Sequence, residues 1–385
     1  MSLFTPEMRL NPFPVYAQLR QFQPVTYIEP LGTWAIFRYE DVKAVLSDHT
    51  HFSSQIAHLF GDPSKGVSLV FTDPPRHTKL RAIVTKAFTP AAIARLEPRI
   101  AAIADELLDK VADRGQMDIT ADLSYPLPVI VIAEMLGVPA EDRADFKRWS
   151  NAEAELFNAV LSAETPEHLV KADLELEAYL KAAIDERRSK PREDLITDLI
   201  NAEVDGEKLN EGDLIQFCKL LLVAGNETTT NLIGNAVLTL LEHPGQLELL
   251  RQNPTLIPAA IEEVLRYRSP VQAMFRLVKA DVQIGGQEIK AGDKVTAFMG
   301  SANRDETRFT EPDKFIITRD PNPHVAFGHG IHFCLGAPLA RLETKVALTA
   351  LLKRFAHLER ADNEPLQLVP SFIMWGLAAL PVTIR

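Results

Sequence analysis

The most informative part of this chain is a decapeptide near the C-terminus, Phe327-Gly328-His329-Gly330-Ile331-His332-Phe333-Cys334-Leu335-Gly336. It surrounds one of the two cysteines of the chain with glycines and histidines. This pattern is typical of a thiol that is accessible to a ligand rather than packed in the core. Glycine adopts backbone conformations closed to other residues and lets the main chain approach a flat or bulky partner closely. The segment therefore predicts a cradle that offers a thiolate to a metal.

Downstream, residues 337–348 return to helical spacing, so Cys334 lies just ahead of a predicted helix N-terminus. The helix dipole favours an anion there, which favours the thiolate form of the cysteine. Zinc is an alternative metal, because three histidines lie within eleven residues that end at the cysteine: His324, His329 and His332. Structural zinc usually takes a second pair of ligands, however, and the only other cysteine is the distant Cys218. A buried cysteine that acts as a small hydrophobic residue is the third alternative.

The composition limits the class of protein. The chain has 385 residues, of which 46% are hydrophobic, enough for a deep core that could enclose a cofactor. A net charge of -11 argues against nucleic-acid binding, which needs a concentrated basic face. Two cysteines far apart in sequence fit a reducing cytoplasm better than a disulfide framework. Because no run of about eighteen apolar residues occurs, we expect a soluble, cytoplasmic protein without a membrane span.

No linker or low-complexity run divides the sequence, so we predict one continuous domain over residues 1–385. Apolar residues three and four positions apart indicate helices in two regions, approximately 76–266 and 337–356. Segments with β-like composition and turn signals lie at approximately 20–40, 271–300 and 367–385. The expected fold class is mainly α with small β-sheets.

One long helix is predicted over residues 211–242, because the segment contains no proline, Asn210 can cap its start and His243-Pro244 ends it. Its middle is polar, Ala224-Gly225-Asn226-Glu227-Thr228-Thr229-Thr230, between two apolar runs. A glycine inside a helix costs about 1 kcal/mol relative to alanine, and threonine can bond back to a carbonyl and bend the helix. Taken alone, this polar segment has two interpretations. It is either an irregularity that a long helix tolerates, or a weakened helical turn that serves a function.

Three further patterns place charged residues together. Glu263 and Arg266 are three residues apart and pair on one face of a helix, as many surface residues do. His77 and Arg81 are four residues apart after a proline pair, so two cations point the same way. Arg276 lies in a strand-like segment, where an inward arginine needs a carboxylate or phosphate partner. The cations indicate an enclosed dianion, and the alternative is a set of ordinary solvated charges.

In this order, the patterns resemble one family over essentially the whole chain, the cytochrome P450 haem-thiolate monooxygenases in their soluble bacterial form. The resemblance rests on the cysteine loop, on Ala224-Gly225-x-Glu227-Thr228 and on Glu263-x-x-Arg266. By the same resemblance, Arg319 completes a buried Glu-Arg-Arg triad. The implied fold encloses haem between a long central distal helix and a proximal cysteine loop plus helix.

The resemblance also implies the roles of individual residues. Cys334 is the expected axial thiolate ligand of the iron in haem b, iron protoporphyrin IX. Glu227 and Thr228 are the expected catalytic pair, which delivers the protons needed to cleave dioxygen, the co-substrate. Four residues are expected to bind the two haem propionates, His77, Arg81, Arg276 and His332. The other residues expected to contact the cofactor are Ala224, Gly225, Phe327, Gly328 and Gly336.

The implied reaction is the hydroxylation or epoxidation of a hydrophobic small molecule. Electrons are expected from NAD(P)H through separate proteins, a ferredoxin or flavodoxin and a ferredoxin reductase. A basic rim for this partner would consist of Arg76, Lys79, Lys86, Arg341 and Lys345. Two alternatives share the cysteine loop, a peroxide-driven peroxygenase and a non-catalytic haem-binding sensor, but neither needs the acid and alcohol at 227 and 228.

The expected substrate pocket is apolar, which fits a hydrophobic ligand without identifying it. Its expected lining residues are Leu221, Ala224, Val271, Met274, Phe275 and Ile373. The loop at 56–72 and the turn at 371–375 would border the pocket, and residues 155–180 would form a lid. Fatty acids, terpenoids, steroids and polyketides all satisfy this expectation.

Overall fold

The structure, a computed structural model, describes residues 5–56, 68–158, 166–361 and 364–385. The chain forms two compact units, and each is described by itself. The first unit comprises Met1–Ser54, Ala101–Ser124 and Thr228–Arg385, and the second comprises Gln55–Ile100 and Tyr125–Glu227. Two helices continue from the second unit into the first, α6 (Glu97–Asp109) and α11 (Glu211–Glu242).

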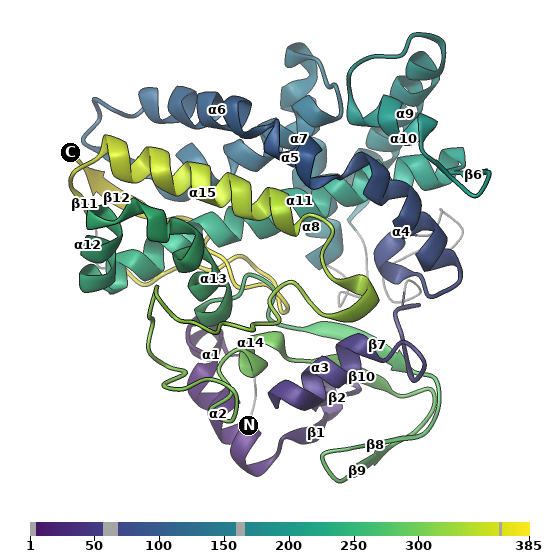
Figure 1. The fold of residues 1–385 in the computed structure, drawn as a ribbon, viewed down its shortest axis with the longest axis vertical. Coiled ribbons are helices and arrows are strands. Elements are labelled where there is room, and N and C mark those ends of the chain that lie inside the picture. Colours follow the sequence, from purple (N-terminus) through teal and green to yellow (C-terminus); the bar gives the residue numbers. More distant parts are fainter. Residues whose placement is uncertain (1–4, 57–67, 159–165, 362–363) are drawn as a thin grey trace. The chain divides into compact units, whose positions relative to one another are not determined.

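The first unit contains a five-stranded sheet in the order β1-β2-β10-β7-β3 (Figure 1). The β1-β2 hairpin turns at Gly32, whose positive φ of 56° favours glycine. Strand β10 pairs parallel with β2 and antiparallel with β7, which places Val295 opposite Arg276. The strands of this sheet are β1 (Val25–Ile28), β2 (Thr33–Ile36), β3 (Phe52–Ser53), β7 (Met274–Val278) and β10 (Lys294–Ala297).

Smaller strands and several helices complete the first unit. One hydrophobic core cluster of this unit is formed by aliphatic and aromatic residues, including residues from α3, β2, β7 and β10. Ile36, Val42 and Val295 are among them. The remaining strands are β4 (Gln116–Asp118), β8 (Val282–Ile284), β9 (Gln287–Ile289), β11 (Leu358–Arg360) and β12 (Pro381–Ile384). The helices are α1 (Pro6–Leu10), α2 (Phe13–Phe22), α3 (Tyr39–Ser47), α12 (Pro244–Gln252), α13 (Ile257–Tyr267), α14 (Met299–Ala302) and α15 (Ala337–Arg354).

The second unit is almost entirely helical. Helices α8 and α9 pack against each other, and α9 also packs on α10. Its helices are α4 (Arg76–Ala87), α5 (Pro90–Ala94), α7 (Pro126–Met135), α8 (Arg143–Asn158), α9 (Glu167–Ser189) and α10 (Leu195–Asn201). Its strands are the short hairpin pair β5 (Glu203–Val204) and β6 (Glu207–Lys208).

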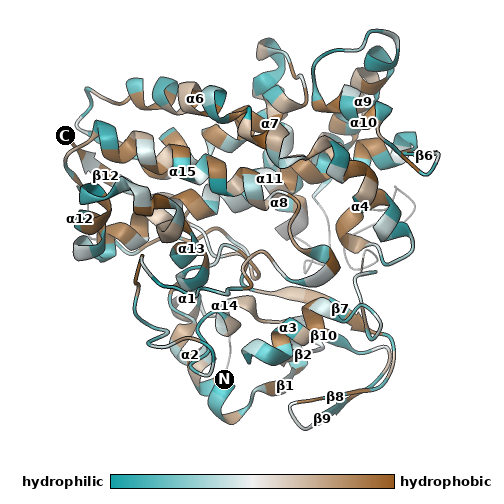
Figure 2. Ribbon diagram, in the orientation of Figure 1, coloured by the Kyte–Doolittle hydropathy of each residue, from teal (hydrophilic) through white to brown (hydrophobic). Residues whose placement is uncertain are grey.

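The predicted fold class is confirmed, since the chain is mainly helical with small sheets. Helix α11 has the predicted bounds, and the Asn210 side chain caps it by accepting from Asp213 N at 2.8 Å. In Figure 2, α15 carries both hydrophobic and hydrophilic residues along its length. None of the helices in the described ranges is both long enough and apolar enough to cross a membrane.

Two β predictions were longer than the strands that form. The second strand of the hairpin ends at Ile36, because Tyr39 begins α3 and its N–H donates to Asp305 Oδ2 at 2.7 Å. Of residues 367–385, only Pro381–Ile384 forms a regular strand, although a bridge joins Leu368 to Leu377.

Candidate functional site

The cysteine loop is a tight turn in the first unit. Cys334 N donates to the carbonyl oxygen of Phe327 at 3.0 Å, which closes the loop just before α15 begins. Gly328 and Gly330 both have φ of 74°, a conformation that side chains other than glycine rarely adopt. A Cβ on Gly330 would lie 2.9 Å from Ser47 Cα, so this glycine also lets the loop approach α3. The thiol is half-buried, and the start of α15 favours its thiolate form.

The three histidines near Cys334 do not gather around it as zinc ligands. His324 Nε2 lies 3.1 Å from Glu262 Oε2, and His329 Nδ1 lies 2.8 Å from Ser47 Oγ. Among the described residues, no group of three or more His, Cys, Asp and Glu side chains could hold a metal ion. A single thiol fits a metal that another molecule already holds, as haem holds iron.

The predicted propionate ligands divide between the two units. In the first unit, Arg276 is buried in β7 and donates from Nη1 to the carbonyl oxygen of Phe275 at 2.7 Å, while His332 is half-buried in the cysteine loop. In the second unit, α4 carries His77, which is buried, and Arg81, which is half-buried. A buried arginine and a buried histidine suit a carboxylate-bearing cofactor, since solvated side chains would be exposed.

The structure brings together the three residues of the expected triad. Glu263 accepts two hydrogen bonds from Arg266, both 2.8 Å, and two from Arg319 Nε, both 3.1 Å. Ile316 N and the Asn322 amide donate to the same carboxylate. Glu263 and Arg266 are fully buried, so the pair is far from an ordinary surface ion pair.

Helix α11 stays helical through the polar segment at its middle. A Cβ on Gly225 would lie 3.0 Å from Ile132 Cδ1, so the glycine allows close packing of α7 in the second unit. Ala224 is exposed and Glu227 is half-buried in the same unit, whereas Thr228 is the first residue of α11 that belongs to the first unit. Asn226, which the sequence did not single out, donates to Ser150 Oγ on α8 at 2.7 Å.

Four of the predicted pocket residues lie close together in the first unit. A β-bridge joins Val271 to Met374, and the adjacent Gln272 N donates to the carbonyl oxygen of Ile373 at 2.7 Å. Met274 and Phe275 follow in β7 and are half-buried, with the Phe275 ring 6.5 Å from that of Phe372. The other two, Leu221 and Ala224, lie on α11 in the second unit. Of the bordering segments, residues 57–67 and 159–165 lie outside the described residues.

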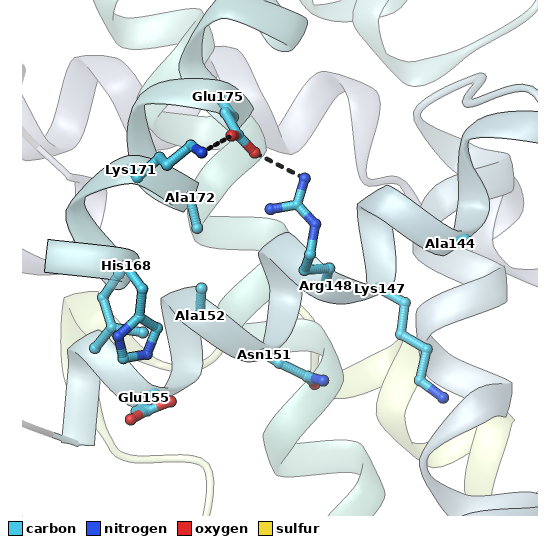
Figure 3. A pocket seen from close by; sticks show the side chains of 11 residues that line it. Ala144, Lys147, Arg148, Asn151, Ala152, Glu155, His168, Lys171, Ala172 and Glu175 are labelled. Carbon is cyan, nitrogen blue, oxygen red and sulfur yellow. Dashed lines mark hydrogen bonds and ion pairs between the residues drawn. The ribbon is translucent and has the colours of Figure 1, made fainter. Parts of the chain in front are cut away.

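The predicted lid region borders a cavity of about 620 Å³ between α8 and α9 (Figure 3). Its lining is rich in charge, since Glu175 pairs with Arg148 at 2.7 Å and with Lys171 at 4.0 Å. Lys147, Asn151, Glu155 and His168 also line it. A cavity with this lining is unlike the apolar substrate pocket that the sequence predicts.

The cations of the predicted basic rim are largely engaged within their own units. In the second unit, Arg76 pairs with Asp213 at 2.6 Å, Lys79 with Glu207 at 2.5 Å, and Lys86 donates to the carbonyl oxygen of Glu203. In the first unit, Arg341 makes a bidentate pair with Glu262 at 2.7 and 2.8 Å. The sequence missed these partners, because pairing between distant residues depends on the tertiary fold.

Three comparisons show what the chain resembles. The sequence model of the family described as Cytochrome P450 matches residues 7–382. The solved structure of cytochrome P450 CYP109Q5 from Chondromyces apiculatus is 46% identical, covers 99% of this chain and 97% of that chain, and superposes with a TM-score of 0.92.

Two other similar proteins have names that state a ligand or a reaction. CYP109E1 from Bacillus megaterium, solved with corticosterone, is 45% identical over 98% of this chain and 99% of that chain, with a TM-score of 0.90. Cyclomarin C epoxidase CymV from Salinispora arenicola is 44% identical over 89% of this chain and 88% of its own length.

Proposed function

The chain belongs to the cytochrome P450 family, and on this basis we propose that it is a haem-thiolate monooxygenase that hydroxylates or epoxidises a hydrophobic small molecule. The observation that carries the proposal is the closed cysteine loop, which presents the half-buried thiol of Cys334 at the start of α15. When bound, thiolate-ligated haem supplies the activation of dioxygen with two electrons, so that one oxygen atom enters the substrate and the other leaves as water.

The proximal residues hold and orient the cofactor in this proposal. Cys334 would supply the thiolate, and Gly328 and Gly336 would lie against the flat ring, in a loop that the Phe327 carbonyl oxygen closes by accepting from Cys334 N. Four side chains supply charge-assisted hydrogen bonds to the two propionates, His77, Arg81, Arg276 and His332. The triad of Glu263, Arg266 and Arg319 anchors the segment that leads to this loop.

The distal residues handle protons. The Thr228 hydroxyl donates and accepts hydrogen bonds, and the Glu227 carboxyl can pass a proton to it through water. With haem bound, the cleavage of dioxygen would consume two protons, which Glu227 and Thr228 would hold and deliver. Ala224 is small and exposed, so it would leave room beside the helix for the cofactor and substrate, and Gly225 would follow it on the helix that faces the cofactor.

Bacterial members of this family use redox partners. We infer that the donor here is a ferredoxin or a flavodoxin, reduced with NAD(P)H by a reductase. Lys345 and the cations at 76, 79, 86 and 341 remain the proposed docking residues, although the acidic partners described above offset much of their charge. Neither of the two cysteines is in a disulfide, which suits a reducing compartment.

The substrate proposed is an apolar molecule the size of a steroid or polyketide. The grouping of Val271, Met274, Phe275 and Ile373 in the first unit offers hydrophobic contacts, and CYP109E1 was solved with corticosterone. Leu221 and Ala224 on α11 are the proposed distal contacts. A spin-shift titration against a library of lipophilic compounds would identify the class.

The first test is spectroscopic. The purified protein, reconstituted with haem, should be red and its reduced carbonyl adduct should show the strongly red-shifted Soret band of thiolate ligation. Cys334→Ala should abolish that band. A protein that stays colourless with added haem would refute the proposed function.

The second test separates a monooxygenase from a sensor or a peroxygenase. With a substrate found by titration, Thr228→Val should lower product per NAD(P)H by about 10-fold or more and release peroxide instead, since general acid–base groups contribute at least about 100-fold to such steps. The matched Thr228→Ser keeps the hydroxyl and should retain most of the yield. Equal yields in both variants would refute the proton-delivery role of Thr228.

A further inference from the structure

A three-residue cluster in the first unit lies beside the cysteine loop and includes Arg341, one of the proposed docking residues. Glu262 on α13 accepts from Arg341 Nε and Nη2 on α15, at 2.7 and 2.8 Å. The same carboxylate lies 3.1 Å from His324 Nε2, which precedes the loop. One carboxylate therefore joins two side chains that are distant in sequence, through three hydrogen bonds.

Hydrogen bonding determines how His324 contributes. Ala326 N donates to His324 Nδ1 at 3.2 Å, so Nδ1 is an acceptor and the ring proton lies on Nε2. From there it is donated to Glu262 Oε2. The histidine therefore connects the carboxylate to the backbone one residue before Phe327.

Both side chains held by Glu262 contact Phe327. The Arg341 guanidinium lies 4.5 Å from the centre of the Phe327 ring, within range of a cation–π interaction. The His324 ring lies 6.3 Å from the same ring. Since the carbonyl oxygen of Phe327 accepts from Cys334 N at 3.0 Å, the position of Phe327 sets the position of the cysteine backbone.

We propose that Glu262 is a positioning residue for the thiolate: through Arg341 and His324 it fixes Phe327 and thereby the backbone that presents Cys334. The inference rests on the proposed haem-thiolate function and extends it to a carboxylate beside the buried triad. Outer residues that orient a metal ligand commonly change metal affinity by about 10- to 100-fold when they are replaced.

The side chains that contact Glu262 keep its carboxyl group ionised. Burial opposes ionisation, but the hydrogen bonds from Arg341 and His324 and the charge of Arg341 outweigh it and lower the pKa of the carboxyl. The carboxylate is therefore available to hold both partners across the physiological pH range.

The experiment uses Glu262→Gln, which keeps the shape of the side chain and removes its charge. The matched control is Glu134→Gln on α7 in the second unit. Glu134 also accepts two bonds from one arginine, Arg99, and one from a second cationic side chain, Arg143. Both variants lose three charge-assisted hydrogen bonds, so their general effect on folding is comparable.

We expect Glu262→Gln to lose haem to a haem acceptor about 10-fold faster than the unsubstituted protein. A larger fraction of its reduced carbonyl adduct should show the Soret band of a protonated or displaced thiol, and its reduction potential should shift. Glu134→Gln should change none of these. Equal changes in Glu262→Gln and Glu134→Gln, or no change in either, would overturn the inference.

A second variant covers the case in which Glu262→Gln does not fold. Arg341→Lys keeps the positive charge but loses the bidentate pair and the planar contact with Phe327. It should reproduce the spectral change, and the double variant should add little to either single one because both act through one contact. An unchanged thiolate band in Arg341→Lys would overturn the inference. Absence of that band from the unsubstituted protein would instead refute the proposed function itself.

Discussion

Two glutamates of the first unit are both fully buried, but their surroundings are opposite. Glu263 on α13 accepts hydrogen bonds from Arg266, Arg319, Ile316 N and Asn322. Glu343 on α15 is 1% exposed, and its Oε1 has no hydrogen-bond partner among the described residues. Burial raises the pKa of Glu343 to about 8, so this side chain is a neutral acid at neutral pH.

The difference shows that burial alone does not decide the state of a carboxyl group. A buried carboxylate is tolerated where donors replace the water that it loses, whereas an isolated one takes up a proton instead. Glu263 can therefore act as an electrostatic anchor for the chain that leads to the cysteine loop. Glu343 contributes no such anchor and occupies core space as a weakly polar side chain.

The largest effect is expected at the paired site. Glu263→Gln leaves two buried guanidinium groups without a carboxylate, so the unfolding free energy should fall by about 3–5 kcal/mol. Denaturant unfolding of the haem-loaded protein measures it. Glu311→Gln, which breaks an exposed pair with Lys314, is the control and should change little. If Glu263→Gln and Glu311→Gln lower the unfolding free energy by the same amount, the buried triad has no special stabilising role.

Much of this arrangement could be predicted from the sequence. The i, i+3 spacing of Glu263 and Arg266 predicted their pairing, and Asn210 with His243-Pro244 predicted the bounds of α11, because these interactions are local. The cysteine loop was recognisable because its glycines and cysteine are contiguous. The placement of Arg319 came from family resemblance, since 56 residues separate it from Glu263.

The interactions that the sequence did not predict are those decided by the tertiary fold. Arg341 was expected to be a free docking cation, but it pairs with Glu262, which lies 79 residues away. Glu343 lies among polar and charged neighbours such as Arg341 and Lys345, so no pattern marked it as buried. Helical spacing gives the residues that share a face, but it does not say which face is covered.

The second prediction concerns the unpaired site. In the unfolded chain Glu343 ionises near its ordinary pKa of 4.5, whereas in the folded chain it keeps its proton up to about 8. Rising pH therefore favours the unfolded state between these two values, and stability falls across that window. The glutamine of Glu343→Gln cannot ionise, so the variant does not lose stability in this way. Between the two pKa values, its unfolding free energy relative to that of the unsubstituted protein should rise by up to about 1.4 kcal/mol per pH unit.

Unfolding free energies measured at pH 5, 6, 7 and 8 test this prediction. The unfolding free energy of Glu343→Gln minus that of the unsubstituted protein should be lowest at pH 5 and highest at pH 8. A constant difference across the series would contradict the assignment of a neutral Glu343.

The smallest effect is expected where carboxyl groups share one cation. In the second unit, Lys219 on α11 contacts Asp173 and lies 3.5 Å from Glu153, with Glu177 also nearby. Burial, and then the hydrogen bond with Asp173, raise the pKa of Glu153 to about 8, so Glu153 holds a proton at pH 7. Asp173→Asn lets Glu153 ionise and take its place beside Lys219, so stability at pH 7 should change by less than about 1 kcal/mol, as expected where no buried charge is left unpaired. Glu153→Gln combined with Asp173→Asn removes both carboxyl groups, and its cost should exceed the sum of the single substitutions, because only the double variant leaves Lys219 without either of the two carboxyl groups that pair with it. Chemical unfolding of the four proteins measures this coupling, and strictly additive costs would show that the two carboxyl groups do not substitute for each other.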